Sequence, residues 1–173
     1  DRVVQMATKI VIEPIFEADF QACSYGFRPK RSATQALEVI RLTGGRGHYH
    51  VVDADIQGFF DAIDHDVLME KMGRRISDRR VLKLLRQWLR AGVMEDGTVR
   101  ASVAGTPQGG VISPFLANVY MTDLDRTWTM TCSGLGQLVR YADDFVILCR
   151  TRRQAEAALE KVRTILGRLR LQL

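Results

Sequence analysis

The sequence predicts an α+β fold in which an antiparallel sheet is backed by helices. Residues 137–149 show the pattern of a strand, a tight turn and a second strand, and residues 50–56 show the pattern of a third strand. Apolar residues at helical spacing occupy most of the chain between and after these segments. Strands and amphipathic helices in this order are typical of a sheet covered by helices.

The first third of the chain is predicted to hold two helices. Residues 2–17 carry apolar side chains at helical spacing, and Pro14 is expected to end or kink that helix. Residues 18–31 contain glycine, proline and several basic residues, which indicate a loop. Ser32 is a suitable N-cap for a second helix that runs to about Arg41. The glycines of residues 44–47 then favour a turn before the first strand.

The remaining elements follow from the same periodicity and from turn residues. Helices are predicted at residues 64–72, with Gly73 as a stop, and at 78–90, 111–129 and 153–169. A hairpin is predicted at residues 93–103 and a glycine- and proline-containing loop at 105–110. The alternating leucines of residues 169–173 favour the start of another strand.

Composition limits the class of protein. The 173 residues suit one domain or a compact piece of a larger protein, and the truncated patterns at both ends favour the piece. Lys and Arg outnumber Asp and Glu by 25 to 20, which permits a polyanionic partner without requiring one. The three cysteines lack metal-site spacing and favour a reducing, cytoplasmic setting. We expect no membrane partner, because no apolar run reaches the roughly 18 residues that a span needs.

Two pairs of aspartates are the candidate chemistry. Asp143 and Asp144 lie at the tip of the predicted hairpin, where their mutual repulsion favours a bound cation, and oxygen-only ligands favour Mg²⁺ or Mn²⁺. Asp53 and Asp55 lie two apart on the predicted strand and share a face. If that strand pairs with the hairpin, Asp55 joins the other two carboxylates. Three such carboxylates can hold two metal ions about 3.5–4 Å apart for in-line phosphoryl displacement.

A simpler interpretation of these acids stays open. Aspartate is common at turns because it tolerates their geometry, and an aspartate at a strand end often caps the next element. Three other aspartates are interpreted as helix-start residues favoured by the helix dipole, namely Asp61, Asp64 and Asp66.

Four motifs in a fixed order carry a family resemblance. They are residues 24–29 (SYGFRP), 55–61 (DIQGFFD), 105–110 (GTPQGG) and 141–144 (YADD). Together they resemble the reverse transcriptase of bacterial group II introns, the intron-encoded maturase family. The resemblance covers nearly the whole chain, and the ordered set is far more specific than any single motif.

The resemblance implies a right-hand polymerase fold, of which this chain would hold the palm and part of the fingers, with the thumb absent. Residues 1–48 would be partial fingers, and residues 49–173 would be the palm, with a fingers-like helical insertion at about 66–104 and truncation at both ends. The implied activity is RNA-directed DNA polymerisation. Its implied partners are an intron RNA template, a DNA primer and dNTPs, its cofactor is two Mg²⁺ ions or Mn²⁺ in their place, and the isolated fragment is expected to be inactive. Alternatives are an RNA-binding maturase that promotes splicing, or a retron or CRISPR-associated reverse transcriptase.

The resemblance also implies roles for particular residues. Catalysis and metal binding would fall to Asp55, Asp143 and Asp144, with the backbone carbonyl of Ile56 as a further metal ligand. Nucleotide binding would fall to Phe60, Gln108, Gly109 and Ala142, and template or phosphate binding to Arg28, Lys30, Arg31 and Pro107. A ring at Phe60 would collide with a 2′-hydroxyl and so exclude ribonucleotides. The alternatives are a core position for Phe60, a plain turn for residues 105–110 and a solvated loop for the basic residues.

Overall fold

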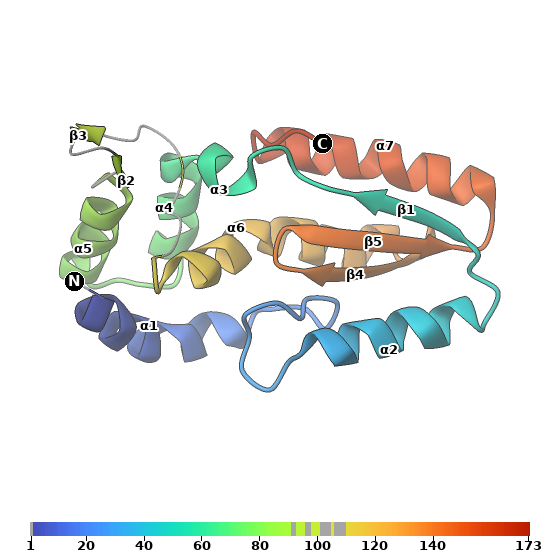
Figure 1. Ribbon diagram of the computed structural model, residues 1–173, viewed down its shortest axis with the longest axis horizontal. Coiled ribbons are helices and arrows are strands. Elements are labelled where there is room, and N and C mark those ends of the chain that lie inside the picture. Colours follow the sequence, from blue (N-terminus) through green and yellow to red (C-terminus); the bar gives the residue numbers. More distant parts are fainter. Residues whose placement is uncertain (1, 91–92, 96–97, 101–104, 106–109) are drawn as a thin grey trace. The chain divides into compact units, whose positions relative to one another are not determined.

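The computed structural model describes residues 2–90, 93–95, 98–100, 105 and 110–173 (Figure 1). The chain divides into two compact units, one made of Asp1–Asp19 with Gly58–Tyr120 and the other of Phe20–Gln57 with Met121–Leu173. The assignment of residues 1–48 to fingers and 49–173 to a palm stays a prediction, since these units describe compactness and not function.

The first unit is mainly helical. It contains α1 (Arg2–Glu17), α3 (Phe59–Ala62), α4 (His65–Gly73), α5 (Arg79–Arg90), the hairpin of β2 (Val93–Glu95) and β3 (Thr98–Arg100), and the beginning of α6 (Ser113–Thr127). The hairpin predicted at residues 93–103 is confirmed by the pairing of β2 with β3. The helices predicted at residues 64–72 and 78–90 are confirmed as α4 and α5. The predicted helix over residues 2–17 is confirmed as α1, and Pro14 does not end it, because α1 continues through Pro14 to Glu17. The short helix α3 was not predicted.

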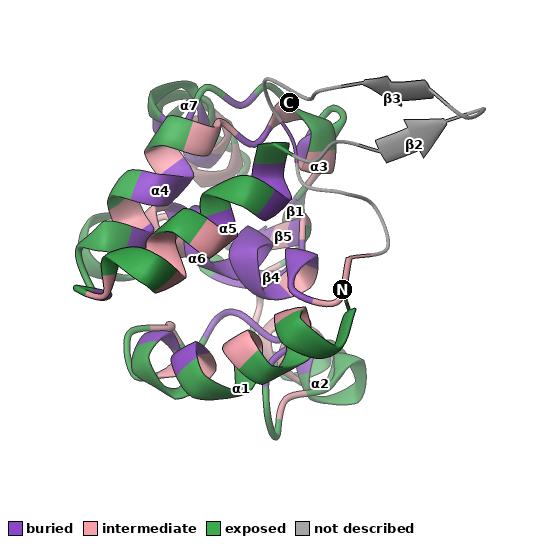
Figure 2. Ribbon diagram, turned by 90° about the vertical axis from the view of Figure 1, so that its left-hand side faces the viewer, coloured by how far each residue is buried: buried purple, intermediate pink, exposed green. Residues whose placement is uncertain are grey.

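Apolar packing and a few polar contacts hold the first unit together. Phe16 of α1 packs edge-on against Phe115 of α6, with ring centroids 5.6 Å apart. Helix α4 begins at the N-cap Asp64, whose carboxylate accepts hydrogen bonds from the next turn, as the sequence predicted. Lys71 of α4 donates to the carbonyl of Tyr120 at 2.8 Å. Helix α6 is buried over most of its length (Figure 2).

The second unit is built on a three-stranded antiparallel sheet. Its strands are β1 (His50–Ala54), β4 (Gln137–Tyr141) and β5 (Asp144–Cys149), in the order β1-β5-β4. Its helices are α2 (Ala33–Gly44), the end of α6, the π-helical segment η1 (Trp128–Cys132) and α7 (Arg152–Arg168). The α+β prediction is confirmed, with α2 and α7 on opposite sides of the sheet (Figure 1).

Side-chain alternation explains how the sheet takes helices on both faces. On one face Val139 and Leu148 form a buried cluster with Tyr25 and with Ala36 of α2. On the other face the buried residues include Leu138, Arg140, Phe145 and Ile147. The capping box at Ser32 fixes the start of α2, because Ser32 and Gln35 exchange side-chain-to-backbone hydrogen bonds.

The predicted strand at residues 169–173 is not formed. Arg170 adopts a left-handed conformation with φ 57°, and the amide of Leu171 donates to the carbonyl of Leu166 at 2.9 Å. These features belong to a C-terminal helix cap in which an apolar residue beyond the helix packs back, and Leu171 is buried. The alternating leucines therefore close α7.

Within the residues that the structure describes, none of the helices combines the length and the apolar character needed to cross a membrane.

Candidate active site

The register of the sheet brings the predicted catalytic aspartates to one end of the second unit. Ala54 of β1 lies opposite Phe145 of β5, and Tyr141 of β4 lies opposite Asp144. Asp55 follows Ala54 directly, so it reaches the level of Asp144 across the sheet. The two-residue turn between β4 and β5 then places Asp143 at the same end. The condition that the sequence set, pairing of the Asp55 strand with the hairpin, is met.

Crowded negative charge is the main electrostatic feature of this end of the sheet. Burial raises the pKa of Asp144, and the nearby charges of Asp143, Asp55 and Asp53 raise it further. Repulsion among carboxylates favours either a proton or a bound cation at the site. The charge and the all-oxygen donor set therefore suit a divalent ion such as Mg²⁺.

The carboxylates do not form a ready-made metal cage. In the described ranges, no three His, Cys, Asp or Glu side chains are grouped closely enough to hold an ion. The carboxylate of Asp55 is turned back to its own chain, where one oxygen accepts a hydrogen bond from the amide of Ile56 at 2.9 Å. Mg²⁺ commonly keeps several water or substrate ligands and needs only one or two protein carboxylates, so the arrangement fits this ion without a closed cage.

The turn that carries Asp143 has an uncommon backbone. Ala142 has φ 60°, in the left-handed region that a residue with a Cβ enters only at a free-energy cost. Gly26 lies directly against this turn, since a Cβ built on it would lie 2.3 Å from the amide nitrogen of Ala142. The loop motif of residues 24–29 therefore contacts the β4-β5 hairpin, and Gly26 is required there by close backbone approach.

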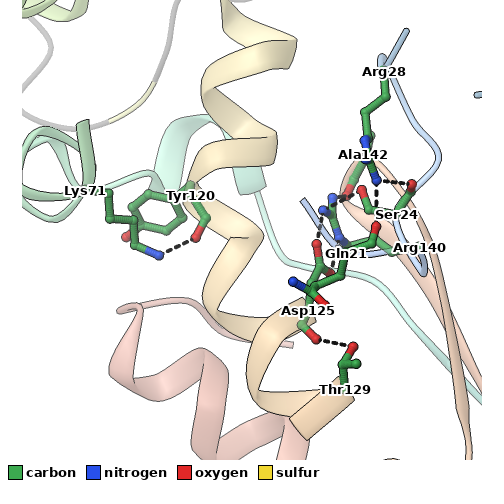
Figure 3. Close-up of polar contacts among 9 residues, drawn as sticks. All are labelled: Gln21, Ser24, Arg28, Lys71, Tyr120, Asp125, Thr129, Arg140 and Ala142. Atoms are coloured by element: carbon green, nitrogen blue, oxygen red, sulfur yellow. Dashed lines mark hydrogen bonds and ion pairs between the residues drawn. The ribbon is translucent and has the colours of Figure 1, made fainter. Parts of the chain in front are cut away.

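Beneath the turn lies a buried ion pair that links three segments (Figure 3). Arg140 of β4 is fully buried and pairs with Asp125 of α6 through two hydrogen bonds, at 2.8 and 2.5 Å. Its remaining donors reach the hydroxyl of Ser24 at 2.8 Å and the carbonyl of Ala142 at 2.5 Å. The carboxylate of Asp125 raises the pKa of Arg140 against the effect of burial, so the guanidinium stays charged.

Sequence reasoning missed this pair. Arg140 lies in a segment that was predicted as an apolar strand, and Asp125 lies in a segment that was predicted as a largely apolar helix. The sequence did contain a signal, namely one basic and one acidic residue in two segments that are otherwise apolar. Because buried charges are usually paired, these two residues could have been expected to meet.

The basic loop residues have different surroundings. Arg28 is buried and donates to the carbonyls of Gln21 at 2.6 Å and Ser24 at 2.7 Å. Lys30 is exposed, and the guanidinium of Arg31 lies over the ring of Tyr25 at 5.3 Å. Arg28 thus shapes the loop, while Lys30 and Arg31 remain on its surface or near it.

Two aromatic rings stand at the surface beside the hairpin. Phe27 is 50% exposed and Tyr141 is 37% exposed, and their centroids are 6.0 Å apart. Phe27 also has a left-handed backbone, with φ 55°.

The predicted nucleotide-binding residues other than Ala142, and the predicted template-binding Pro107, belong to the first unit or lie outside the described residues. Phe60 is half-buried and packs edge-on against the buried Phe59, with centroids 5.3 Å apart. Pro107, Gln108 and Gly109 fall outside the described residues. The predicted roles of all four stay predictions.

The thiols offer no nucleophile. Cys23, Cys132 and Cys149 are unpaired and buried. Burial, aided by the charge of Asp125, raises the pKa of Cys23 to about 12. A thiol with that pKa stays protonated and unreactive at neutral pH.

Comparison with known proteins decides the family. The family described as "Reverse transcriptase (RNA-dependent DNA polymerase)" matches residues 1–173. The chain belongs to the reverse transcriptase family. The right-hand polymerase fold that the motifs implied is thereby confirmed at the level of the family.

Relatives of this reverse transcriptase chain include group II intron proteins, as the motifs implied. The group II intron-encoded protein LtrA of Lactococcus lactis subsp. cremoris is 40% identical over 126 residues, which cover 73% of this chain and 21% of that protein. Protein YkfC of Escherichia coli strain K12 is 37% identical over an alignment 210 residues long. This alignment covers all of this chain and 55% of that protein. The chain thus spans about half of one relative and about a fifth of the other.

The chain is also similar to a solved structure. The partial Cas6-RT-Cas1–Cas2 complex matches with a TM-score of 0.50 and 28% identity, over 96% of this chain and 30% of that one.

The raised pKa of Asp144 predicts a pH-dependent effect of Asp144→Asn on stability. A carboxyl group whose pKa is higher in the folded state loses folding free energy as pH rises through that pKa, and an amide does not. In EDTA at pH 7, Asp144→Asn should raise the melting temperature by about 1–3 °C. The difference should vanish below about pH 3, where the aspartate is largely protonated in both states. Thermal unfolding followed by circular dichroism at several pH values measures this, and a lower melting temperature at pH 7 would contradict it.

The close approach of Gly26 predicts a second effect. Gly26→Ala should reduce the free energy of unfolding by about 1–3 kcal/mol, because the added methyl group overlaps the hairpin backbone. Gly44→Ala is the matched control, since no heavy atom lies within 4 Å of a Cβ there. Urea denaturation of both variants makes the comparison. Equal stabilities would show that the loop and hairpin are not in contact.

Proposed function

We propose that this chain is the catalytic core of an RNA-directed DNA polymerase of the group II intron type. One observation carries the proposal: the β1-β5-β4 register brings Asp55 to the same end of the sheet as Asp143 and Asp144. The likeness to a group II intron-encoded protein supports the type. The reaction is attack of a primer 3′-hydroxyl on the α-phosphate of a dNTP opposite an RNA template, with release of pyrophosphate.

The three carboxylates hold the cofactor in this proposal. Asp55, Asp143 and Asp144 would bind two Mg²⁺ ions, or Mn²⁺ in their place, with the carbonyl of Ile56 as a further ligand. When bound there, Mg²⁺ would lower the pKa of the attacking hydroxyl and neutralise charge on the leaving pyrophosphate. The contribution of the protein is to place acceptor oxygens at the end of a rigid sheet, where substrate phosphates can approach.

Other residues would orient the substrates. Phe60, Ala142, Gln108 and Gly109 are assigned to the nucleotide, and Lys30, Arg31 and Pro107 to the template backbone. We infer from its carbonyl contacts that Arg28 acts through the loop, by shaping the segment that presents Lys30 and Arg31.

A second candidate function is support of intron splicing by RNA binding. The likeness to group II intron-encoded proteins favours it, since the family resemblance allows both roles in one protein. Clustered carboxylates, however, repel a polyanion and contribute nothing to simple RNA binding. Their presence at one end of the sheet favours polymerisation as the function of this site. Three unpaired cysteines support a reducing compartment such as the cytoplasm for either role.

Removal of Asp143 tests the polymerase proposal. In the full-length protein, Asp143→Ala should lower primer extension on an RNA template by about 10²–10³-fold or more, because a ligand of the metal ions that would stabilise the transition state is lost. The melting temperature should not fall, since the substitution relieves repulsion. Asp66→Ala on α4 is the control and should keep full activity. Undiminished extension by Asp143→Ala would refute the assignment, and retained splicing support in that variant would separate the two functions.

Sugar selection gives a further prediction. Phe60→Ala should raise incorporation of ribonucleotides relative to deoxynucleotides by about 10-fold or more, because the bulk that excludes the 2′-hydroxyl is gone. Phe60→Tyr keeps the ring and should keep discrimination. Single-nucleotide extension with each dNTP and rNTP measures the ratio. An unchanged ratio in Phe60→Ala would place this ring in the core alone.

A further inference from the structure

The backbone of the catalytic turn is held from two sides. From below, Arg140 donates to the carbonyl of Ala142 at 2.5 Å. From the other side, the backbone at Gly26 closes against the amide nitrogen of Ala142. Ala142 is 6% exposed and stays in the left-handed region despite its Cβ. A single residue in an unfavourable conformation persists only where its surroundings over-determine it.

The group that holds the turn is itself held in a fixed orientation. The bidentate contact with Asp125 fixes the plane of the Arg140 guanidinium, and the hydroxyl of Ser24 accepts from the same group. Arginine has five donors in a planar fork, so it can pair with a carboxylate and still reach two further acceptors. Lysine has one nitrogen and cannot span all of these positions.

We propose that Arg140 is a positioning residue for the catalytic centre, which fixes the Ala142 carbonyl and through it the backbone that carries Asp143. This inference rests on the proposed function, because it assigns a role toward the metal that Asp143 would bind. Asp143 is the residue that follows Ala142, and its short side chain has few torsions with which to correct a displaced backbone. Buried ion pairs contribute little to stability on balance. The role of this pair is therefore to position the turn.

Arg140→Lys in the full-length protein is the central test. The charge and a contact with Asp125 can remain, while the bond to the Ala142 carbonyl is lost. We expect kcat for primer extension to fall by about 100-fold, as for a misplacement of about 1 Å, with KM for dNTP changed by less than about threefold. The Mg²⁺ concentration for half-maximal activity should rise. Arg163→Lys, at an exposed arginine of α7 paired with Glu160, is the matched control and should behave as the unaltered protein.

Two readouts do not depend on polymerisation. In the metal-free protein, hydrogen exchange should accelerate at the Asp143 and Asp144 amides of Arg140→Lys, while the amides of α7 keep their protection. Mn²⁺ titration followed by electron paramagnetic resonance should show weaker binding in the same variant. Faster exchange and weaker Mn²⁺ binding support the inference even where polymerase activity is absent. Unchanged exchange and unchanged Mn²⁺ affinity in a folded Arg140→Lys protein overturn it.

A milder variant and a double variant keep the test decisive if Arg140→Lys does not fold. Ser24→Ala removes one acceptor of the guanidinium and should lower kcat by about threefold to tenfold, with faster exchange at the turn. The double variant Arg140→Met with Asp125→Leu replaces the ion pair by apolar groups, a change that buried pairs often tolerate. We expect it to fold and to lose primer extension. Full activity in this double variant would show that the pair serves stability alone.

Discussion

The buried ion pair between Arg140 and Asp125 is the constraint on which the second unit depends. A charge removed from water must be paired and hydrogen-bonded, so the position of Arg140 dictates what may surround it. Helix α6 must supply Asp125 at that level, and the loop before α2 must supply the Ser24 hydroxyl. The amide of Arg140 also donates to the carbonyl of Cys23 at 2.8 Å. Two sequence motifs more than a hundred residues apart, SYGFRP and YADD, thereby form one structural element.

The same end of the sheet in the second unit combines charges that pair with charges that do not. Arg140 is neutralised inside the unit by Asp125, whereas burial and the nearby charges of Asp143 and Asp55 raise the pKa of Asp144. Such repulsion lowers stability and is retained where it serves binding of a cation. The sheet supplies the rigidity that this arrangement requires, because backbone pairing sets the spacing of the acids before any ion is bound.

Local patterns predicted most of the elements, whereas the long-range side-chain contacts escaped prediction. The hairpin of β4 and β5, strand β1 and the cap at Ser32 follow from alternation and capping chemistry within a few residues. The closure of α7 by Leu171 did not follow, because alternating leucines fit a strand and a helix cap equally well until Arg170 adopts its left-handed backbone. Pairing of Arg140 with Asp125 depends on how α6 packs on the sheet, which periodicity does not contain. The candidate aspartates were predicted from their places on a strand and at a hairpin tip and then from motif order, which indicates a shared role without giving their geometry.

The motif of residues 24–29 shows how far such a resemblance reaches. The resemblance assigned template or phosphate binding to Arg28 of this motif, which stays a prediction, and the structure shows members of the motif in contact with the hairpin and with their own loop. Ser24 binds Arg140, Gly26 lies against Ala142, and Arg28 satisfies carbonyls of its own loop. An aspartate side chain is too short to compensate for a displaced backbone, so a metal-binding turn needs a rigid support on each side. A loop whose glycine permits contact and whose serine anchors the arginine below supplies that support, which explains why the two motifs occur together in a protein whose site consists of carboxylates.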